Sequence, residues 1–232
     1  MTAAERICVA LDFPTREETL AMARRLGSRV GWLKVGLEAF AAEGPSLVRE
    51  VAGSGARVFL DLKFHDIPAT VAGAVASAAR SGAAMVNVHA SGGRAMLDAA
   101  REAATRAGLE RLIAVTLLTS LDAEALRELP LSPADAPHEI ARRLAVLAKS
   151  CGLDGVVCSA TDLSEIRRTC GADFLTVVPG IRPAGAGVQD QKRVATPAAA
   201  IEAGADILVI GRPITAAKDP VEALEAIVAQ IR

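Results

Sequence analysis

The sequence predicts an α/β fold, a (β/α)₈ TIM barrel that residues 1–232 form as a single domain. Short apolar runs rich in β-branched residues alternate with longer amphipathic segments, and the alternation occurs eight times. Near-continuous apolar runs are typical of parallel strands buried on both faces. Dividing 232 residues among eight strand–helix units gives 29 residues per unit, which suits a small barrel. An open doubly wound sheet is the alternative, but no G-x-G-x-x-G follows the first run.

The predicted strands follow one another without a linker or low-complexity segment that would divide the chain. In order, they are Ile7–Leu11, Trp32–Leu37, Arg57–Leu62, Met85–His89, Leu112–Leu118, Gly155–Ser159, Phe174–Pro179 and Ile207–Gly211. In such a barrel all the carboxyl ends of the strands meet at one face, which is where active sites lie.

The segments between the strands carry helix signals. Thr15 and Glu18 form a capping box, while Thr196-Pro197 and Asp219-Pro220 each place a capping side chain before a proline at the first helical position. Glycines stand where helices should end, at Gly27, Gly82, Gly108, Gly171 and Gly204. These signals predict a helix after each strand.

Charge and composition exclude several classes of function. With 26 Lys and Arg against 27 Asp and Glu, the net charge of −1 offers no basic surface for nucleic acid. The apolar stretches are too short for a membrane span, and the N-terminus lacks the layout of a signal peptide. Three scattered histidines and four cysteines without C-x₂-C spacing argue against zinc and leave only carboxylate sites for magnesium. We therefore expect a cytoplasmic protein with neither nucleic-acid nor membrane partners.

Polar residues gather at the carboxyl ends of the predicted strands. They are Asp12, Lys34, Asp61–Asp66, His89, Thr119–Ser120, Gly180–Arg182 and Gly211–Arg212. A single charged strand end is explained by solvation, whereas charge at the ends of the first, second, third, seventh and eighth strands predicts a functional site.

The third strand suggests acid–base chemistry. Asp61 and Lys63 are two residues apart, so their side chains share one face of a strand, and Lys34 on the adjacent strand can reach the same place. Alternating lysine and aspartate charges make mutual burial tolerable. The residues are either a buried ion-pair network that closes the barrel or a catalytic array in which a lysine donates a proton.

The ends of the seventh and eighth strands indicate a phosphate site. Gly180 and Gly211 allow the backbone to approach a ligand closely, and Arg212 can bind phosphate oxygens through two hydrogen bonds. Residues 182–191 are polar and contain glycine, which suits either a lid over a ligand or an ordinary flexible loop.

These residues also carry a resemblance. Asp61-Leu-Lys-Phe-His-Asp-Ile-Pro-Ala-Thr70 resembles the D-x-K-x-x-D-I-P-x-T signature of the orotidine 5′-phosphate decarboxylase family. Similar matches extend over nearly the whole chain, at Val9–Asp12, Lys34–Gly36, Val86–Ala90, Val115–Ser120, Pro179–Pro183, Asp190–Arg193 and Val209–Pro213. The resemblance implies a homodimeric (β/α)₈ barrel that converts orotidine 5′-monophosphate to uridine 5′-monophosphate (UMP) and CO₂. This is the last step of de novo pyrimidine biosynthesis, and the family uses neither metal nor cofactor.

The resemblance also implies roles for the charged residues. Lys63 would donate a proton to C6 of the pyrimidine, Asp61 would lie beside the substrate carboxylate, and Lys34 would complete the charge array while binding the ribose. Asp66 and Thr70 would reach across the dimer interface into the partner's site.

The remaining expected contacts hold the ligand. Asp12 would accept hydrogen bonds from ribose hydroxyls, and Thr119 and Ser120 would meet the pyrimidine edge. Phosphate would be bound by Gln191, Gly211 and Arg212, with Arg182 at the base of the lid. Whether Gln189 or Gln191 reaches the phosphate rests on the match at Asp190–Arg193 alone. His65 and His89 are expected to shape the structure rather than to transfer protons.

Two other functions are open. One is a magnesium-dependent sugar-phosphate decarboxylase or aldolase of the same superfamily, which shares the D-x-K pattern. The other is a non-catalytic nucleotide sensor that keeps the pocket. The continuation from Asp66 to Thr70 and the pair Thr119–Ser120 favour the nucleotide decarboxylase.

Overall fold

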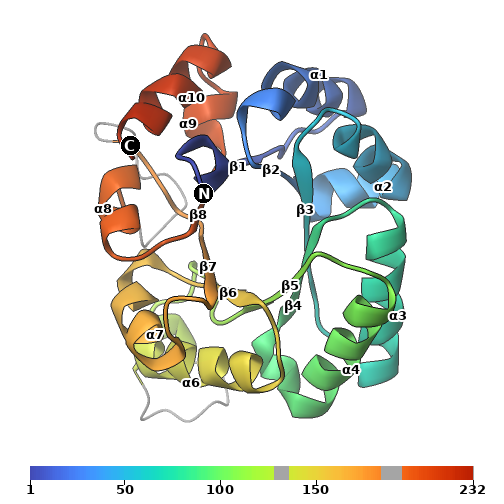
Figure 1. Cartoon of the computed structure of the whole chain (residues 1–232), viewed down its shortest axis with the longest axis vertical. Coiled ribbons are helices and arrows are strands. Elements are labelled where there is room, and N and C mark those ends of the chain that lie inside the picture. The colour runs from blue at the N-terminus through green and yellow to red at the C-terminus, as the bar shows by residue number, and fades with distance from the viewer. Residues whose placement is uncertain (128–135, 184–194, 232) are drawn as a thin grey trace.

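The computed structural model describes residues 1–127, 136–183 and 195–231, in which eight parallel strands form a closed barrel (Figure 1). Each strand pairs with its neighbours in sequence, and β8 closes the ring against β1. The helices lie around the outside of this ring (Figure 1). The predicted fold class is therefore confirmed.

All eight predicted strands are present. They are β1 (Ile7–Ala10), β2 (Trp32–Gly36), β3 (Arg57–Phe64), β4 (Met85–His89), β5 (Arg111–Val115), β6 (Gly155–Val157), β7 (Leu175–Val178) and β8 (Ile207–Ile210). The largest difference from prediction is that β5 stops at Val115 rather than Leu118, while β3 continues to Phe64 rather than Leu62 and β6 stops at Val157 rather than Ser159. The neighbour β6 ends at Val157, which pairs with Val115, so β5 has no ladder partner on that side beyond this point.

The helices begin at the predicted caps. Thr15 accepts a hydrogen bond from the Glu18 amide, Thr196 caps α8, and Asp219 caps α10. The α-helices are α1 (Arg16–Leu26), α2 (Leu37–Ala52), α3 (Pro68–Arg80), α4 (Gly93–Arg106), α5 (Ala123–Arg127), α6 (Pro137–Ser150), α7 (Leu163–Cys170), α8 (Pro197–Glu202), α9 (Arg212–Thr215) and α10 (Pro220–Ala229). None of the helices in the described parts of the chain is both long and apolar enough to cross a membrane.

The core has two parts because successive strand residues face opposite sides of the sheet. One part fills the barrel, and its buried residues are Cys8, Ala10, Trp32, Phe59, Met85, Ile113, Val177, Ile207 and Val209. The other packs the strands against the helices and includes Leu60 and Leu62 of β3. On β3, Phe59 faces inward and Leu60 outward, so Asp61 is directed into the barrel above an apolar filling.

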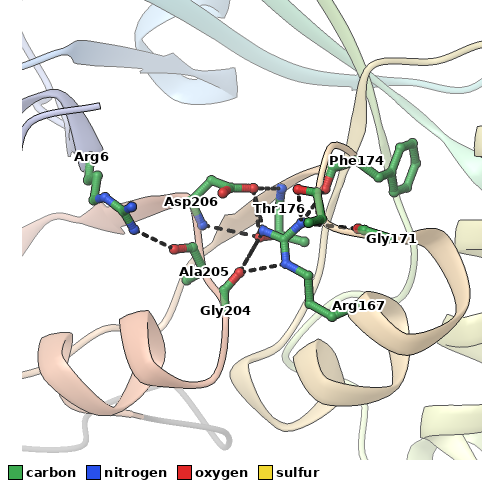
Figure 2. A network of polar contacts seen from close by, with 9 residues as sticks. Arg6, Arg167, Gly171, Phe174, Thr176, Gly204, Ala205 and Asp206 are labelled. Carbon is green, nitrogen blue, oxygen red and sulfur yellow. Dashed lines mark hydrogen bonds and ion pairs between the residues drawn. The ribbon is translucent and has the colours of Figure 1, made fainter.

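A polar network joins the amino-terminal ends of β7 and β8. Arg167 on α7 donates hydrogen bonds to the carbonyl oxygens of Phe174 (2.7 Å) and Gly204 (2.8 Å) and pairs with the carboxylate of Asp206 (Figure 2). The Thr176 hydroxyl accepts a hydrogen bond from the same guanidinium at 2.8 Å and donates one to Gly204 at 3.0 Å. This network ties together the loops that precede the two strands.

Candidate active site

The carboxyl ends of the strands surround a cavity of about 540 Å³. The predicted site residues that line it are Asp12, Lys34, Asp61, Lys63, Thr119, Arg182, Gly211 and Arg212. They come from segments far apart in the sequence, and the barrel brings them together because it places the ends of all its strands on one face.

Four of these side chains form a continuous array of alternating charge. The Lys34 ammonium lies 2.9 Å from Asp12 Oδ1 and 3.5 Å from Asp61 Oδ2, and Lys63 Nζ lies 2.7 Å from Asp61 Oδ1. The side chains of Lys34 and Asp61 are only 10% and 13% exposed, whereas that of Lys63 is 28% exposed. Lys63 is therefore the array's more accessible cation.

The array keeps its central groups charged. Burial opposes the charge of Lys34, but the carboxylates of Asp61 and Asp12 outweigh burial and hold its pKa above the ordinary value. Burial also opposes the charge of Asp61, yet Lys34, Lys63 and a hydrogen bond from Asn87 hold the pKa of this carboxyl below its ordinary value. A buried, ionised carboxylate thus stands next to an ammonium that faces the cavity.

The backbone of Lys63 is strained. Its φ of 51° is in the left-handed region. In the described parts of the chain, every other residue with a φ in this region is a glycine. Such a conformation costs of order 1–2 kcal/mol outside glycine. Strain of this kind persists where the surrounding structure holds it, and here it aims the lysine toward Asp61 and the cavity.

Two residues of this site were not singled out by the sequence analysis. Asn87 on β4 is fully buried and hydrogen-bonds to both Lys63 and Asp61, and its signal was an amide in the middle of an apolar strand. Gly36 leaves room for the first ion pair, because a Cβ there would lie 2.9 Å from both Asp12 Oδ1 and Lys34 Nζ. Its signal was the glycine of the Lys34-Val-Gly36 match.

The predicted phosphate side of the cavity contains two arginines and two glycines. Arg182, Arg212, Gly180 and Gly211 all line the cavity. Gly180 has a φ of 77°, which disfavours any other residue, and Gly211 is the cap before α9. Cations and accessible backbone on one wall suit an anionic ligand group. Gln189, Gln191 and the predicted lid from residue 184 onward lie outside the described residues.

The structure does not bring every predicted residue to this cavity. Ser120 is exposed and does not line it, although its neighbour Thr119 does. Asp66 and Thr70 are also exposed and do not line the cavity of their own chain. Asp66 instead accepts a hydrogen bond from the Ile67 amide at 2.6 Å.

Two histidines stand beside the array rather than in the cavity lining. The rings of His65 and His89 have centroids 5.4 Å apart, at the ends of β3 and β4. Burial, with the nearby charges of His65 and Lys63, lowers the pKa of His89 below its ordinary value. In the described parts of the chain, no group of three or more His, Cys, Asp or Glu residues is placed to hold a metal ion.

Comparison with known proteins agrees with this geometry. The profile of the Orotidine 5′-phosphate decarboxylase / HUMPS family matches residues 5–227. An orotidine 5′-phosphate decarboxylase from Halorhodospira halophila is 55% identical over 227 residues, covering 97% of this chain and 95% of that protein. One from Nitrosospira multiformis is 55% identical over 215 residues, covering 93% of this chain and 89% of that protein.

Solved structures show the same likeness. The crystal structure of orotidine 5′-phosphate decarboxylase from Lactobacillus acidophilus matches with a TM-score of 0.86 and 36% identity, covering 98% of this chain and 99% of that one. Barrel, charged array and sequence similarity over nearly the whole length lead to one conclusion. The chain belongs to the orotidine 5′-phosphate decarboxylase / HUMPS family.

Proposed function

We propose that this protein is an orotidine 5′-phosphate decarboxylase, a lyase that converts orotidine 5′-monophosphate to UMP and CO₂ in pyrimidine biosynthesis. The observation that carries the proposal is the array Asp12–Lys34–Asp61–Lys63 at the mouth of the barrel. It occurs in a chain that is 55% identical to relatives of that name over nearly its whole length.

The reaction needs a fixed cation at one carbon atom. The bond between C6 and the carboxylate breaks, CO₂ leaves, and the electron pair stays on C6 in an orbital that no carbonyl can delocalise. Lys63 stabilises this localised charge and then transfers a proton from its ammonium to C6, which yields UMP and a neutral amine that solvent reprotonates. A compact ammonium suits this task because it can approach the carbon closely.

Asp61 has two effects in this scheme. It holds Lys63 through the 2.7 Å contact, and in the proposed scheme the substrate carboxylate binds beside it. Two like charges 4 Å apart repel by about 4 kcal/mol at an effective dielectric constant near 20. Lys34 and Lys63 relieve part of this repulsion, so we assign the larger share of catalysis to stabilisation of the carbanion.

The remaining cavity residues bind the parts of the substrate that do not react. Arg212, Arg182, Gly211 and Gln191 hold the phosphate, Asp12 and Lys34 bind the ribose, and Thr119, which lines the cavity, meets the pyrimidine edge. Binding energy from the distant phosphate accelerates the reaction only if it organises the site around C6.

We also propose that the active form is a homodimer and works in the cytoplasm. Asp66 and Thr70 are exposed and flank Ile67, which is a large apolar side chain left 66% exposed. A second copy would cover this segment and receive Asp66 and Thr70 in its own site.

A magnesium-dependent sugar-phosphate enzyme is the alternative, since the matched family includes the HUMPS branch. It would use the same carboxylates to hold a cation rather than to position Lys63. A nucleotide sensor is the alternative outside enzymes, and it would bind UMP without turnover.

The test is the ultraviolet absorbance of orotidine 5′-monophosphate, followed with excess EDTA for the wild type and for Lys63→Ala. The chain has no tyrosine and a single tryptophan, which keeps its own absorbance low. Turnover that resists EDTA and is lost in Lys63→Ala supports the decarboxylase. A folded wild type without turnover contradicts it, and activity on sugar phosphates that requires magnesium would establish the alternative.

A further inference from the structure

Asn87 is a fully buried polar residue whose position is unusual for a barrel strand. Along β4, Met85 belongs to the filling of the barrel and Val86 and Val88 pack toward the helices, so Asn87 faces the interior. It is the next inward position above Met85, level with the charged array. Buried amides are expensive unless both of their polar atoms find partners.

The pairing of β3 with β4 explains why a polar side chain stands there. The register runs from Leu60 opposite Val86 to Phe64 opposite Val88. Three residues of β3, Asp61–Lys63, therefore face a single residue of β4, which is Asn87. A bulge of this kind removes backbone groups from the ladder, and those groups need other partners.

The Asn87 side-chain amide hydrogen-bonds to a backbone group and to a side chain of this bulge. Its Oδ1 accepts the backbone N–H of Lys63 at 2.9 Å, and its Nδ2 donates to Asp61 Oδ1 at 2.7 Å. The first contact fixes the orientation of the amide, because only an oxygen can accept from that N–H. Nδ2 is thereby directed at Asp61, whose Oδ1 also receives Lys63 Nζ at 2.7 Å.

We propose that Asn87 is a positioning residue for the reaction, and this rests on the proposed function. It holds the left-handed turn at Lys63 through one hydrogen bond and the orientation of the Asp61 carboxylate through the other. An uncharged amide does this without weakening the ion pair between the two residues. Asn87 does not line the cavity in the described structure, so it acts through Lys63 and Asp61 rather than on the substrate.

The first variant removes both contacts. In Asn87→Ala we expect kcat to fall by about 100-fold, because displacement of a reacting group by about 1 Å costs this much. The dissociation constant of UMP, measured by titration calorimetry, should change by less than about threefold, since this ligand lacks the carboxylate at C6 and is held elsewhere. The matched control is Thr176→Val, which removes a fully buried hydroxyl at the opposite end of the barrel and should leave kcat unchanged.

The second variant keeps the shape and changes the chemistry. Asn87→Asp retains an oxygen that accepts from Lys63, but the introduced carboxyl can donate to Asp61 only when protonated. The surrounding charged and titratable groups are Asp61 and Lys63 on β3, Lys34 on β2 and His89 on β4. We expect kcat to decline as pH rises through the pKa of the introduced carboxyl, a limb that wild type and Thr176→Val lack. This variant remains informative if Asn87→Ala fails to fold.

The outcomes separate this inference from the proposed function. Normal kcat in folded Asn87→Ala, or a wild-type pH profile in Asn87→Asp, would overturn the role of Asn87 even with wild-type turnover intact. If the wild type itself does not turn over, the proposed function fails. The positioning role is then tested by the rate of trace acetylation at Lys63, which is located by peptide mass spectrometry. Faster acetylation of Lys63 in Asn87→Ala supports it, and an unchanged rate overturns it.

Discussion

The two ends of the barrel each carry a network of polar side chains, and the networks are built differently. At the amino-terminal end, Arg167 contacts main-chain carbonyls, the Thr176 hydroxyl and the Asp206 carboxylate (Figure 2). At the carboxyl-terminal end, Asp12, Lys34, Asp61 and Lys63 contact one another and face a cavity. The first network is enclosed by main-chain and side-chain partners between two strands, whereas the charged groups of the second also line a cavity.

The difference shows how one fold separates stability from activity. Arg167 joins segments that folding must bring together in any case, so its contacts contribute to the free energy of unfolding. Lys63 instead has a left-handed backbone, which costs stability at the position where chemistry is expected. In barrels of this type, the carboxyl-terminal face carries the site and the opposite face serves stability. Four substitutions test whether this division holds here.

The largest effect is expected for Lys63→Gly. In the proposed mechanism Lys63 is the fixed cation and the proton donor, so its loss should lower kcat by at least about 10³-fold. Glycine adopts the left-handed turn without strain, so the free energy of unfolding should stay within about 1 kcal/mol of wild type. Decarboxylation assays and urea denaturation on the same preparation check both halves. A large loss of stability would mean that Lys63 also supports the fold, and the division between the two ends would break.

Arg167→Ala should give the converse result. Removing the guanidinium leaves the partly buried Asp206 carboxylate and several carbonyl oxygens without this partner, and the free energy of unfolding should fall by about 2–4 kcal/mol. Turnover per folded molecule should stay within about threefold, because the site lies at the other end. Arg168→Ala is the matched control, since that neighbouring side chain is 72% exposed and pairs with Glu165. Equal losses in the free energy of unfolding in the two variants would refute the proposed contribution of Arg167 to stability.

Arg212→Ala tests the proposed phosphate site, on the wall of the same cavity at the carboxyl-terminal end. Charge-assisted hydrogen bonds to phosphate are worth about 1.5–3 kcal/mol, so kcat/KM should drop between about 10- and 100-fold. Inhibition by inorganic phosphate should weaken in parallel. Arg106→Ala, whose side chain is 68% exposed on α4, serves as the control. An effect below about twofold would remove Arg212 from the phosphate site.

The smallest effect concerns pH and His89. Its pKa is lowered in the folded state, so the unfolded chain binds the proton more readily. The free energy of unfolding should therefore fall as pH decreases from near 6.5 towards the folded-state pKa. His89→Gln should flatten this part of the profile, measured by denaturation between pH 7.5 and pH 5. The exposed His138→Gln is the control, and an identical slope in wild type and His89→Gln would exclude His89 as the source.

Sequence patterns were sufficient for the architecture and for most of the charged residues that line the cavity. The eight strands, the caps at Thr15, Thr196 and Asp219, and the charged strand ends were all predicted, because strand periodicity and capping are local properties. Asp61 and Lys63 could be placed on one face because side chains alternate along a strand. Their grouping with Asp12 and Lys34 followed from the barrel itself.

The tertiary structure decided what depends on register and on distant contacts. The bulge that faces Asp61–Lys63 with Asn87 arises from the pairing of β3 with β4, which no local pattern encodes. The left-handed turn at Lys63 and the two hydrogen bonds of Asn87 follow from this register. Arg167 and Asp206 meet across 39 residues of sequence for the same reason. The sequence determined which residues reach the site, and the packing of neighbouring strands determined how Lys63 is held there.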